Sequence, residues 1–261
     1  MLDGSIGQHT TVVVSLDDRL ATPQGKRAYV RALFATIADR YDFITVALSY
    51  GQDRRWKRRL IELASIRAGH RVLDLATGTG DIAFAASDHG ARVVGLDITH
   101  RMIQLARMKG QERREGQEGQ EGQEGKTQFI VGDMLALPFP STSFDIVTTG
   151  YGLRNVPDLT QGIDEISRVL TPGGQLLSLD FNRPSGAIVR TAYLAYLTVV
   201  GASLGWVLHR DPDTYRYIPA SIRRYPGAEG VARLLEAHGF SQVTVYPVLG
   251  GLMTIHHAVR T

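Results

Sequence analysis

The stretch from residue 72 to residue 81, Val-Leu-Asp-Leu-Ala-Thr-Gly-Thr-Gly-Asp, most narrows what this chain can fold into. It begins as an apolar run of strand length and ends in two glycines, after which a helix can start. A strand, a glycine turn and a helix in this order open many ligand-binding α/β folds, because the turn lets backbone approach the ligand. The glycine spacing alone is weak evidence for such a fold.

Two acids make the motif more informative. Asp74 lies inside the predicted strand, and Asp81 is the first residue of the predicted helix. A helix N-terminus attracts phosphate through its dipole and its free N–H groups, and two carboxylates there would repel phosphate. They favour a cationic ligand that carries an amine and a sulfonium, such as S-adenosylmethionine, and they disfavour an NAD-dependent reductase.

Strands and helices alternate along most of the chain. Strands are predicted at 71–76, 92–97, 128–131, 144–149, 175–181, 242–247 and 252–259, and helices at 81–88, 100–109, 158–170 and 228–238. This alternation predicts an α/β Rossmann-like fold with a mostly parallel sheet and helices on both faces. The last two strands are close enough in sequence to form an antiparallel hairpin.

The remaining segments predict the domain organisation. Residues 1–25 are expected to form a flexible leader and residues 26–261 a single domain. Lid helices are predicted within 26–66, at 26–40 and 53–64, and residues 185–225 break the alternation as an inserted helical cap. Residues 110–126 contain a repeated Gln-Glu-Gly and no apolar side chain, which predicts a flexible insertion, with an acidic interaction segment as the alternative.

Composition excludes several kinds of chemistry. The chain has no cysteine, so disulfides, cysteine-ligated metals and a thiol nucleophile are excluded. No metal site is predicted. The first residues lack the pattern of a signal peptide, and a cytoplasmic protein is expected. Residues 191–208 carry no charge and approach membrane-spanning length, but their glycine, threonine and tyrosine content favours a buried or membrane-contacting cap helix.

The formal net charge is +3, and basic residues are concentrated in Arg54-Arg-Trp-Lys-Arg-Arg59. This run is either a solvated helix face or a patch that meets anionic lipid headgroups. No nucleic-acid motif accompanies it, so nucleic acid is not an expected partner. A homodimer is compatible with the sequence.

Two further acids end predicted strands. Asp97 ends the second strand, where an acid can accept the hydroxyls of a ribose. Asp133 ends the third strand, where its carboxylate could accept from an adenine amino group, with Met134 against the ring. Each acid could instead cap a helix or a turn. Three acids in register with the ligand edge of the sheet, counting Asp74, favour the binding interpretation.

The fourth strand leads into a glycine-broken loop, Gly150-Tyr-Gly-Leu-Arg-Asn-Val156. Arg154 and Asn155 lie at its apex. A buried cation and amide are costly unless they are paired or used in chemistry. The structural alternative is an arginine paired with an acid and an asparagine that closes a turn.

At this point the chain resembles a known family, the ubiquinone/menaquinone-biosynthesis C-methyltransferases (the UbiE/MenG type). The similarity runs from about residue 30 to the end. The motifs that carry it are Phe34-Ala-Thr-Ile-Ala-Asp-Arg-Tyr-Asp42, Leu48-Ser-Tyr-Gly51, Trp56-Lys-Arg58, the 72–81 stretch, Leu137-Pro-Phe139, Ser143-Phe-Asp145, Gly152-Leu-Arg-Asn-Val156, Arg168-Val-Leu-Thr-Pro-Gly-Gly174, Tyr215-Arg-Tyr217, Ser221-Ile222 and His238-Gly-Phe240.

The resemblance implies a class I S-adenosylmethionine-dependent methyltransferase acting on ring carbon of a polyprenyl hydroquinone. The resemblance carries family cofactor positions over to Thr79, Asp97, Asp133 and Met134. With the residues of the glycine motif and the fourth strand, Asp74, Thr77, Gly78, Gly80 and Gly150, these are the residues expected at the cofactor. Gly150 departs from the family, which often has serine there, so a contact from that side chain is lost. The Gln-Glu-Gly insertion is also unlike the family.

The predicted reaction needs a way to remove the proton of a ring hydroxyl, because a phenolate is the better carbon nucleophile. Arg154 could stabilise the phenolate but is a poor base, since it stays protonated. Asn155 could orient the hydroxyl, and Tyr41 and Asp42, on a lid loop, could complete a relay. His256 and His209 are alternative bases.

The sequence favours demethylmenaquinol as the substrate, because Tyr225-Pro-Gly227, Pro247 and Gly250-Gly251 look more like the menaquinone branch. The benzoquinol precursor of ubiquinone is the first alternative, followed by another small aromatic molecule. A more distant alternative is a non-catalytic S-adenosylmethionine-binding partner in a quinone-synthesis assembly.

Overall fold

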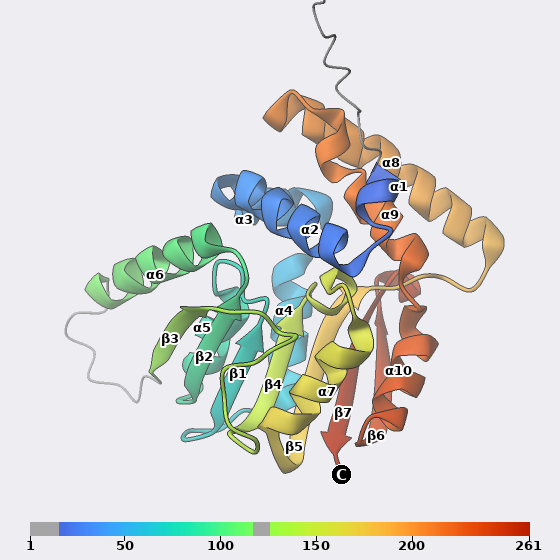
Figure 1. Ribbon diagram of the computed structural model, residues 1–261. Helices are drawn as coiled ribbons and strands as arrows, with labels where there is room; N and C mark the ends of the chain where they lie inside the picture. The colour runs from blue at the N-terminus through green and yellow to red at the C-terminus, as the bar shows by residue number, and fades with distance from the viewer. Residues whose placement is uncertain (1–15, 117–125) are drawn as a thin grey trace, which may run out of the picture.

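A computed structural model describes residues 16–116 and 126–261 of the chain. Seven strands form one sheet in the order β3-β2-β1-β4-β5-β7-β6 (Figure 1). All neighbouring strands are parallel except β7, which runs antiparallel to β5 and β6, as predicted. The strands are β1 (Arg71–Leu75), β2 (Arg92–Asp97), β3 (Thr127–Val131), β4 (Phe144–Gly150), β5 (Leu170–Phe181), β6 (Phe240–Val248) and β7 (Met253–Arg260).

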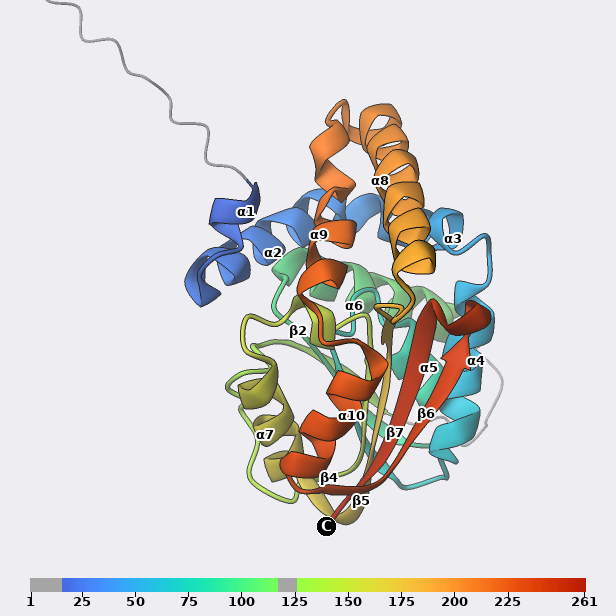
Figure 2. The same ribbon diagram turned by 90° about the vertical axis from the view of Figure 1, so that its right-hand side faces the viewer.

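The sheet carries a hydrophobic core on each face. Because successive strand residues point to opposite faces, Val72 belongs to one core and Leu73 to the other. Helices cover both faces, as predicted (Figure 2), but the helix at 53–64, which was expected in the lid, packs on the sheet instead. Helices α4 (Asp53–Ala64), α5 (Asp81–Ser87) and α6 (His100–Glu115) pack on the first face, and α7 (Leu159–Val169) and α10 (Gly227–Ala237) on the second.

A lid and a cap lie together over the carboxyl ends of the parallel strands (Figure 1). The lid comprises α2 (Pro23–Ile37), the 3₁₀ helix η1 (Ala38–Arg40) and α3 (Tyr41–Leu48), and the cap comprises α8 (Ala187–His209), η3 (Pro212–Tyr215) and α9 (Tyr217–Arg224). Tyr217 of the cap packs with Val30 of the lid, and Tyr215 packs with Ile37. Lid and cap therefore share small cores of their own.

The leader predicted at 1–25 is wrong for its last ten residues. A short helix, α1 (Leu16–Arg19), precedes α2, and Leu20 is buried against the lid. Thr22 caps α2 by accepting from the N–H of Gly25 (3.1 Å), and Pro23 occupies the first helical position. A threonine followed by proline is a helix-start signal, so the sequence did contain the information.

The predicted insertion begins later than expected. Helix α6 continues to Glu115, past the low-complexity start at 110. Arg113 explains this, because it pairs with Asp88 (2.6 Å) and stacks over the Phe84 ring at 5.0 Å. Residues 117–125, which hold the Gln-Glu-Gly repeat, lie outside the described residues.

Two other local predictions are wrong. Tyr41 and Asp42 do not lie on a loop but begin α3, which was not predicted. The strand predicted at 175–181 begins earlier, because β5 starts at Leu170, includes Pro172-Gly-Gly174 and shifts register against β4 there. An irregular pairing is compatible with proline and glycine at this point.

Candidate active site

The glycine turn after β1 brings backbone close to the neighbouring strand. Gly78 and Gly80 both have positive φ, 55° and 90°. A Cβ at Gly80 would come within 2.8 Å of the Phe129 ring and 2.9 Å of the Phe84 ring, so only glycine fits there. The turn is held by the Gly78 N–H, which donates to the Asp97 carboxylate (3.0 Å).

Asp97 is buried at the end of β2 with both carboxylate oxygens in use. One oxygen accepts from Gly78 and the other accepts from the N–H of Thr99 (2.8 Å). Burial raises the pKa of Asp97, although these backbone N–H groups act in the opposite direction. The carboxylate is thereby fixed toward the space above the sheet.

A first cavity of about 80 Å³ lies at the carboxyl ends of the first four strands. Five of the nine residues predicted at the cofactor line it: Gly78, Asp97, Asp133, Met134 and Gly150. The lid closes this cavity with Phe34, Tyr41 and Arg27, and the Arg27 guanidinium pairs with Asp133 (2.6 Å). Ligand pockets usually measure about 300–1,000 Å³, so this cavity is small for a nucleoside with Arg27 and the lid in these positions.

The other four predicted cofactor residues do not line this cavity. Asp74 points into the protein, where the hydroxyls of Thr77 (2.6 Å) and Thr148 (2.8 Å) donate to it. Burial raises the pKa of Asp74 to about 6. The expectation that Asp74 faces the ligand is therefore wrong in this structure, and Asp74 orders the turn instead. Gly80 lies in the turn, below the residues that line the cavity.

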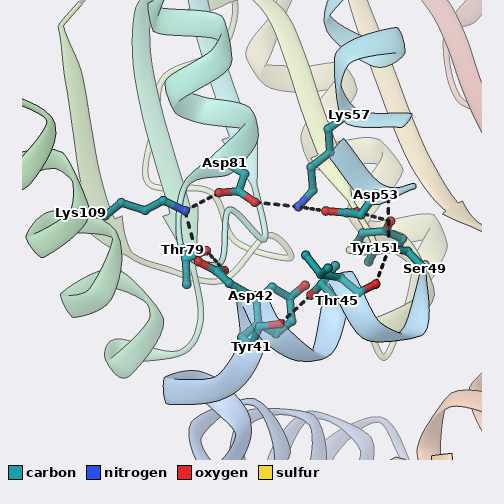
Figure 3. Close-up of polar contacts among 11 residues, drawn as sticks. Tyr41, Asp42, Thr45, Ser49, Asp53, Lys57, Thr79, Asp81, Lys109 and Tyr151 are labelled. Atoms are coloured by element: carbon teal, nitrogen blue, oxygen red, sulfur yellow. Dashed lines mark hydrogen bonds and ion pairs between the residues drawn. The ribbon is translucent and has the colours of Figure 1, made fainter. Parts of the chain in front are cut away.

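The second acid of the motif, Asp81, is also turned away from the cavity. It pairs with Lys57 (2.9 Å) and Lys109 (Figure 3). Burial opposes ionisation, but the two lysines lower the pKa of Asp81 to about 2. The two lysines neutralise the charge of Asp81, so Asp81 has little influence on whether the turn binds a cationic or an anionic ligand.

Asp42 joins the lid to the glycine turn. Its carboxylate accepts from the Thr79 hydroxyl (2.6 Å) and pairs with Lys109 (3.2 Å) (Figure 3). Both predicted residues, Asp42 and Thr79, are therefore engaged with each other and line neither of the two cavities at the site. This contact holds α3 against the turn.

A second cavity of about 370 Å³ extends from the first toward the surface. Its lining is mainly apolar and aromatic and comes from the lid, the β4 loop, β5 and the cap. Phe34, Tyr41 and Tyr151 line both cavities, so the two meet at these side chains. Burial raises the pKa of Tyr41 to about 12, so this phenol stays protonated at neutral pH.

Arg154 lines the second cavity and is buried with a partner that the sequence did not indicate. Its Nε pairs with Asp180 at the end of β5 (3.2 Å), its backbone N–H also donates to Asp180 (3.0 Å), and its Nη1 donates to Ser221. The guanidinium stacks on the Phe181 ring at 5.0 Å. Asp180 could have been found by the rule that selected the other acids, since it too ends a parallel strand.

Asn155 lies next to Arg154 but lines the first cavity. Its amide nitrogen donates to the Tyr151 carbonyl (2.7 Å), while its buried Oδ1 has no hydrogen-bond partner among the described residues. A buried acceptor without a partner is unfavourable, and a ligand donor in the cavity would satisfy it.

The two histidines considered as bases are elsewhere. His209 contacts the Tyr215 hydroxyl (3.0 Å), and His256 contacts the Ala228 carbonyl (2.9 Å). Neither lines either cavity. Burial lowers the pKa of both, so both favour the neutral form. Within residues 16–116 and 126–261, moreover, no group of three or more acids and histidines could hold a metal ion.

Strand order and a ligand cavity at the carboxyl ends of β1, β2 and β4 define the class I S-adenosylmethionine-dependent methyltransferases. A solved structure of this class, a possible histamine N-methyltransferase from Thermotoga maritima, matches with a TM-score of 0.60 over 89% of this chain and all of its own. It is 15% identical, so this likeness concerns the fold.

Sequence comparison identifies the family. Residues 22–260 match the profile of the ubiE/COQ5 methyltransferase family, and the chain belongs to that family. The chain is 37% identical to a ubiquinone/menaquinone biosynthesis C-methyltransferase UbiE from Serratia proteamaculans, over 90% of this chain and 92% of the relative. It is 40% identical to a demethylmenaquinone methyltransferase from Thermus thermophilus, over 80% and 91%.

The protein is therefore a quinone C-methyltransferase of this family, and its cofactor is S-adenosylmethionine. The first cavity fits that cofactor chemically. It offers two carboxylates, Asp97 and Asp133, and the unsatisfied oxygen of Asn155, which are acceptors for hydroxyl and amino groups. Apolar side chains such as Leu96 and Met134 line the rest.

Proposed function

We propose that the protein methylates a ring carbon of demethylmenaquinol to give menaquinol. The second cavity is the observation that carries this proposal. It is apolar along most of its length, has the Arg154 cation in its wall and meets the cofactor cavity at Tyr41 and Tyr151. A hydroquinone with an isoprenoid tail has matching parts, a polar ring at the junction and an apolar chain directed outward.

Relatives bear on the choice of ring. The Thermus thermophilus relative carries the name demethylmenaquinone methyltransferase, whereas the Serratia proteamaculans relative is named for both quinones. Together with the menaquinone-like residues near the C-terminus, this supports the naphthoquinol. Methylation of the ubiquinone-precursor benzoquinol is the second candidate.

The first cavity suggests how the cofactor is held. Asp97 would accept the ribose hydroxyls, as acids at the end of the second strand do in related folds. Asp133 would accept from the adenine amino group, exchanging its Arg27 partner for the nucleoside, with Met134 against the ring. When bound, S-adenosylmethionine supplies an electrophilic methyl group.

The second cavity suggests how the ring is activated. Arg154 Nη2 has no hydrogen-bond partner among the described residues and belongs to a guanidinium that lines the cavity. A preorganised cation there would stabilise a phenolate oxygen as charge develops on the ring. Tyr41 and Tyr151 would hold the ring carbon in line with the methyl donor and exclude water.

A single assay tests the proposed function. The purified protein is incubated without oxygen with S-adenosylmethionine and short-chain demethylmenaquinol, beside a matched benzoquinol, and ring methylation is followed by mass spectrometry. We expect methylated naphthoquinol that depends on the cofactor. Methylation of the benzoquinol alone would move the activity to the ubiquinone pathway, and no product from either, with cofactor binding intact, would support a non-catalytic partner.

We further propose that the protein works from the cytoplasm at an anionic bilayer, from which its substrate enters. Helix α8 is long and apolar enough to cross a membrane, with a mean hydropathy of 1.5, but one of its faces packs against Ile222 of α9 and Phe181 of β5. Its outer face is apolar, with Val199 65% and Trp206 59% exposed. The exposed Tyr50 and Leu249 line the second cavity, and Tyr50 stacks on Tyr196 of α8, so the cavity opens beside this helix.

The basic side chains of α4 also support binding to an anionic bilayer. The exposed arginines of α4, Arg54, Arg55, Arg58 and Arg59, follow α3 directly in the chain. Interfacial binding typically combines apolar and aromatic side chains with basic residues that attract anionic headgroups. A substrate with a long isoprenoid tail would reach the cavity from the bilayer without crossing water.

Liposome flotation tests this surface. We expect wild-type protein to float with vesicles that contain phosphatidylglycerol, and less so at high salt because charges are then screened. Val199→Asp should lower the bound fraction several-fold, whereas Val131→Asp, on the exposed edge strand β3, should leave it unchanged. Flotation of the Val199→Asp variant at the wild-type level would contradict the proposal. A Val199→Asp effect on self-association alone would point to a homodimer surface.

A further inference from the structure

The proposed reaction releases one proton, and the residues considered so far do not take it. In C-methylation the C–S bond breaks, the sulfur keeps its electron pair, a C–C bond forms and one proton leaves the quinol. Arg154 stays protonated and is paired with Asp180. His209 and His256 lie outside both cavities. Asp42 is occupied by Thr79 and Lys109.

Tyr151 stands where such a proton would be released. It follows β4 directly and has a φ of 62°, a left-handed conformation that is costly for a residue other than glycine. Its side chain lines both cavities at their junction. Its hydroxyl donates to the Asp53 carboxylate at 2.6 Å, across 98 residues of sequence.

From Asp53 a row of charged groups leads outward (Figure 3). Asp53 pairs with Lys57 (2.6 Å), and Lys57 pairs with Asp81 (2.9 Å). The exposed fraction of these side chains rises along the row, from 2% for Asp53 to 12% for Lys57 and 34% for Asp81. The same three residues line a groove on the surface. The junction of the cavities is thus connected to solvent on the far side of the lid.

We propose that Tyr151 and Asp53 form the proton exit of this active site. The quinol O–H proton passes to the Tyr151 oxygen while the Tyr151 proton passes to Asp53, and Asp53 then releases it to water in the groove beside Lys57 and Asp81. The resulting phenolate carbon attacks the methyl group and gives a ring ketone; the ring C–H proton is then lost and a proton is returned to the ketone oxygen, which restores the aromatic hydroquinone. One proton leaves overall.

The surroundings of Tyr151 explain why it relays rather than stores a proton. The titratable and charged groups that face it are Asp53 of α4, Tyr41 of α3 and Asp180 of β5. Burial first, and these neighbours next, raise the pKa of Tyr151 well above its usual value. A lasting tyrosinate is therefore disfavoured, and the proton must pass through in one concerted step. Burial opposes the charge of Lys57, but Asp81 and Asp53 raise the pKa of Lys57, so a cation stays beside the Asp53 carboxylate.

This inference rests on the proposed function, and hydroxyl deletion tests it. Tyr151→Phe should lower kcat about 100-fold at pH 7, within the range of general acid–base catalysis, with the affinity for S-adenosylmethionine unchanged. Because a phenolic hydroxyl ionises unaided near pH 10, the deficit should shrink steadily as pH rises toward 10. Asp53→Asn should show the same profile. Tyr246→Phe, a hydroxyl deletion on the edge strand β6, should behave as wild type.

The two proposals fail in different ways. The variants are assayed, without oxygen, on whichever quinol the wild type methylates, so a change of ring leaves the test intact. Absence of wild-type turnover on both quinols would overturn the proposed function and the proton exit with it. Normal turnover by Tyr151→Phe, a deficit that persists at high pH, or a parallel loss of cofactor affinity would overturn the proton exit alone.

Discussion

Replacing Arg154 with methionine should lower the free energy of unfolding by about 3–5 kcal/mol, because it leaves the Asp180 carboxylate buried without a counter-charge. Both side chains are almost fully buried, 4% and 1% exposed. The loss is measured by urea denaturation monitored by circular dichroism. Arg71→Met, which removes an ion pair with Asp145 that is 45% and 33% exposed, should cost only about 0–1 kcal/mol.

A second substitution separates stability from catalysis. In the double variant Arg154→Met/Asp180→Asn the buried charge is gone, and the amide can still accept from the backbone N–H of residue 154. We expect stability to recover most of the loss while turnover stays about 100- to 1,000-fold low, because the cation at the quinol oxygen is missing. Near-normal turnover by the double variant would show that Arg154 serves the fold alone.

Replacing Asp97 with asparagine should weaken S-adenosylmethionine binding about 10- to 100-fold, measured by titration calorimetry. A carboxylate only accepts hydrogen bonds, and both oxygens of Asp97 already accept from backbone N–H groups. An amide NH2 would have to face Gly78 or Thr99, so this isosteric change disturbs the turn as well as the ribose contact. Hydrogen bonds to charged groups contribute about 1.5–3 kcal/mol, which corresponds to that range.

The pH dependence of binding gives a second readout for Asp97. Burial raises its pKa, and the ionised form is the better acceptor for hydroxyls. Cofactor affinity of the wild type should therefore fall as pH drops through the pKa of Asp97 in the free protein, and the Asp97→Asn variant should lack this component. Asp88→Asn, an exposed acid paired with Arg113, is the matched control and should bind like wild type. Unchanged affinity in Asp97→Asn would contradict the ribose role.

Local sequence patterns were enough to predict the fold and the position of the site. The apolar strand, the glycine turn and the alternation of elements were sufficient for the sheet, because they depend on backbone geometry and on burial along one strand or helix. The acids at strand ends, Asp97 and Asp133, line the first cavity because the carboxyl ends of parallel strands share one edge.

Those patterns could not predict which side chains pair with each other, because the pairs depend on distances between segments that meet only in the folded chain. Asp74 lies one residue before the end of β1 and Asp97 ends β2, yet Asp74 turns inward to Thr77 and Thr148. Asp42 was expected at the substrate and instead bonds to Thr79, 37 residues away.

The chemistry of the site follows from these long-range pairings. Arg154 meets Asp180 across 26 residues, and Tyr151 meets Asp53 across 98. Residue types and spacing indicate that a cation, an amide and a phenol are near the ligand edge of the sheet. The packing of the lid and cap against that edge decides which charged side chains there are paired with each other and which can meet a ligand. The reason is that buried ionic groups are stable only with a partner at close distance.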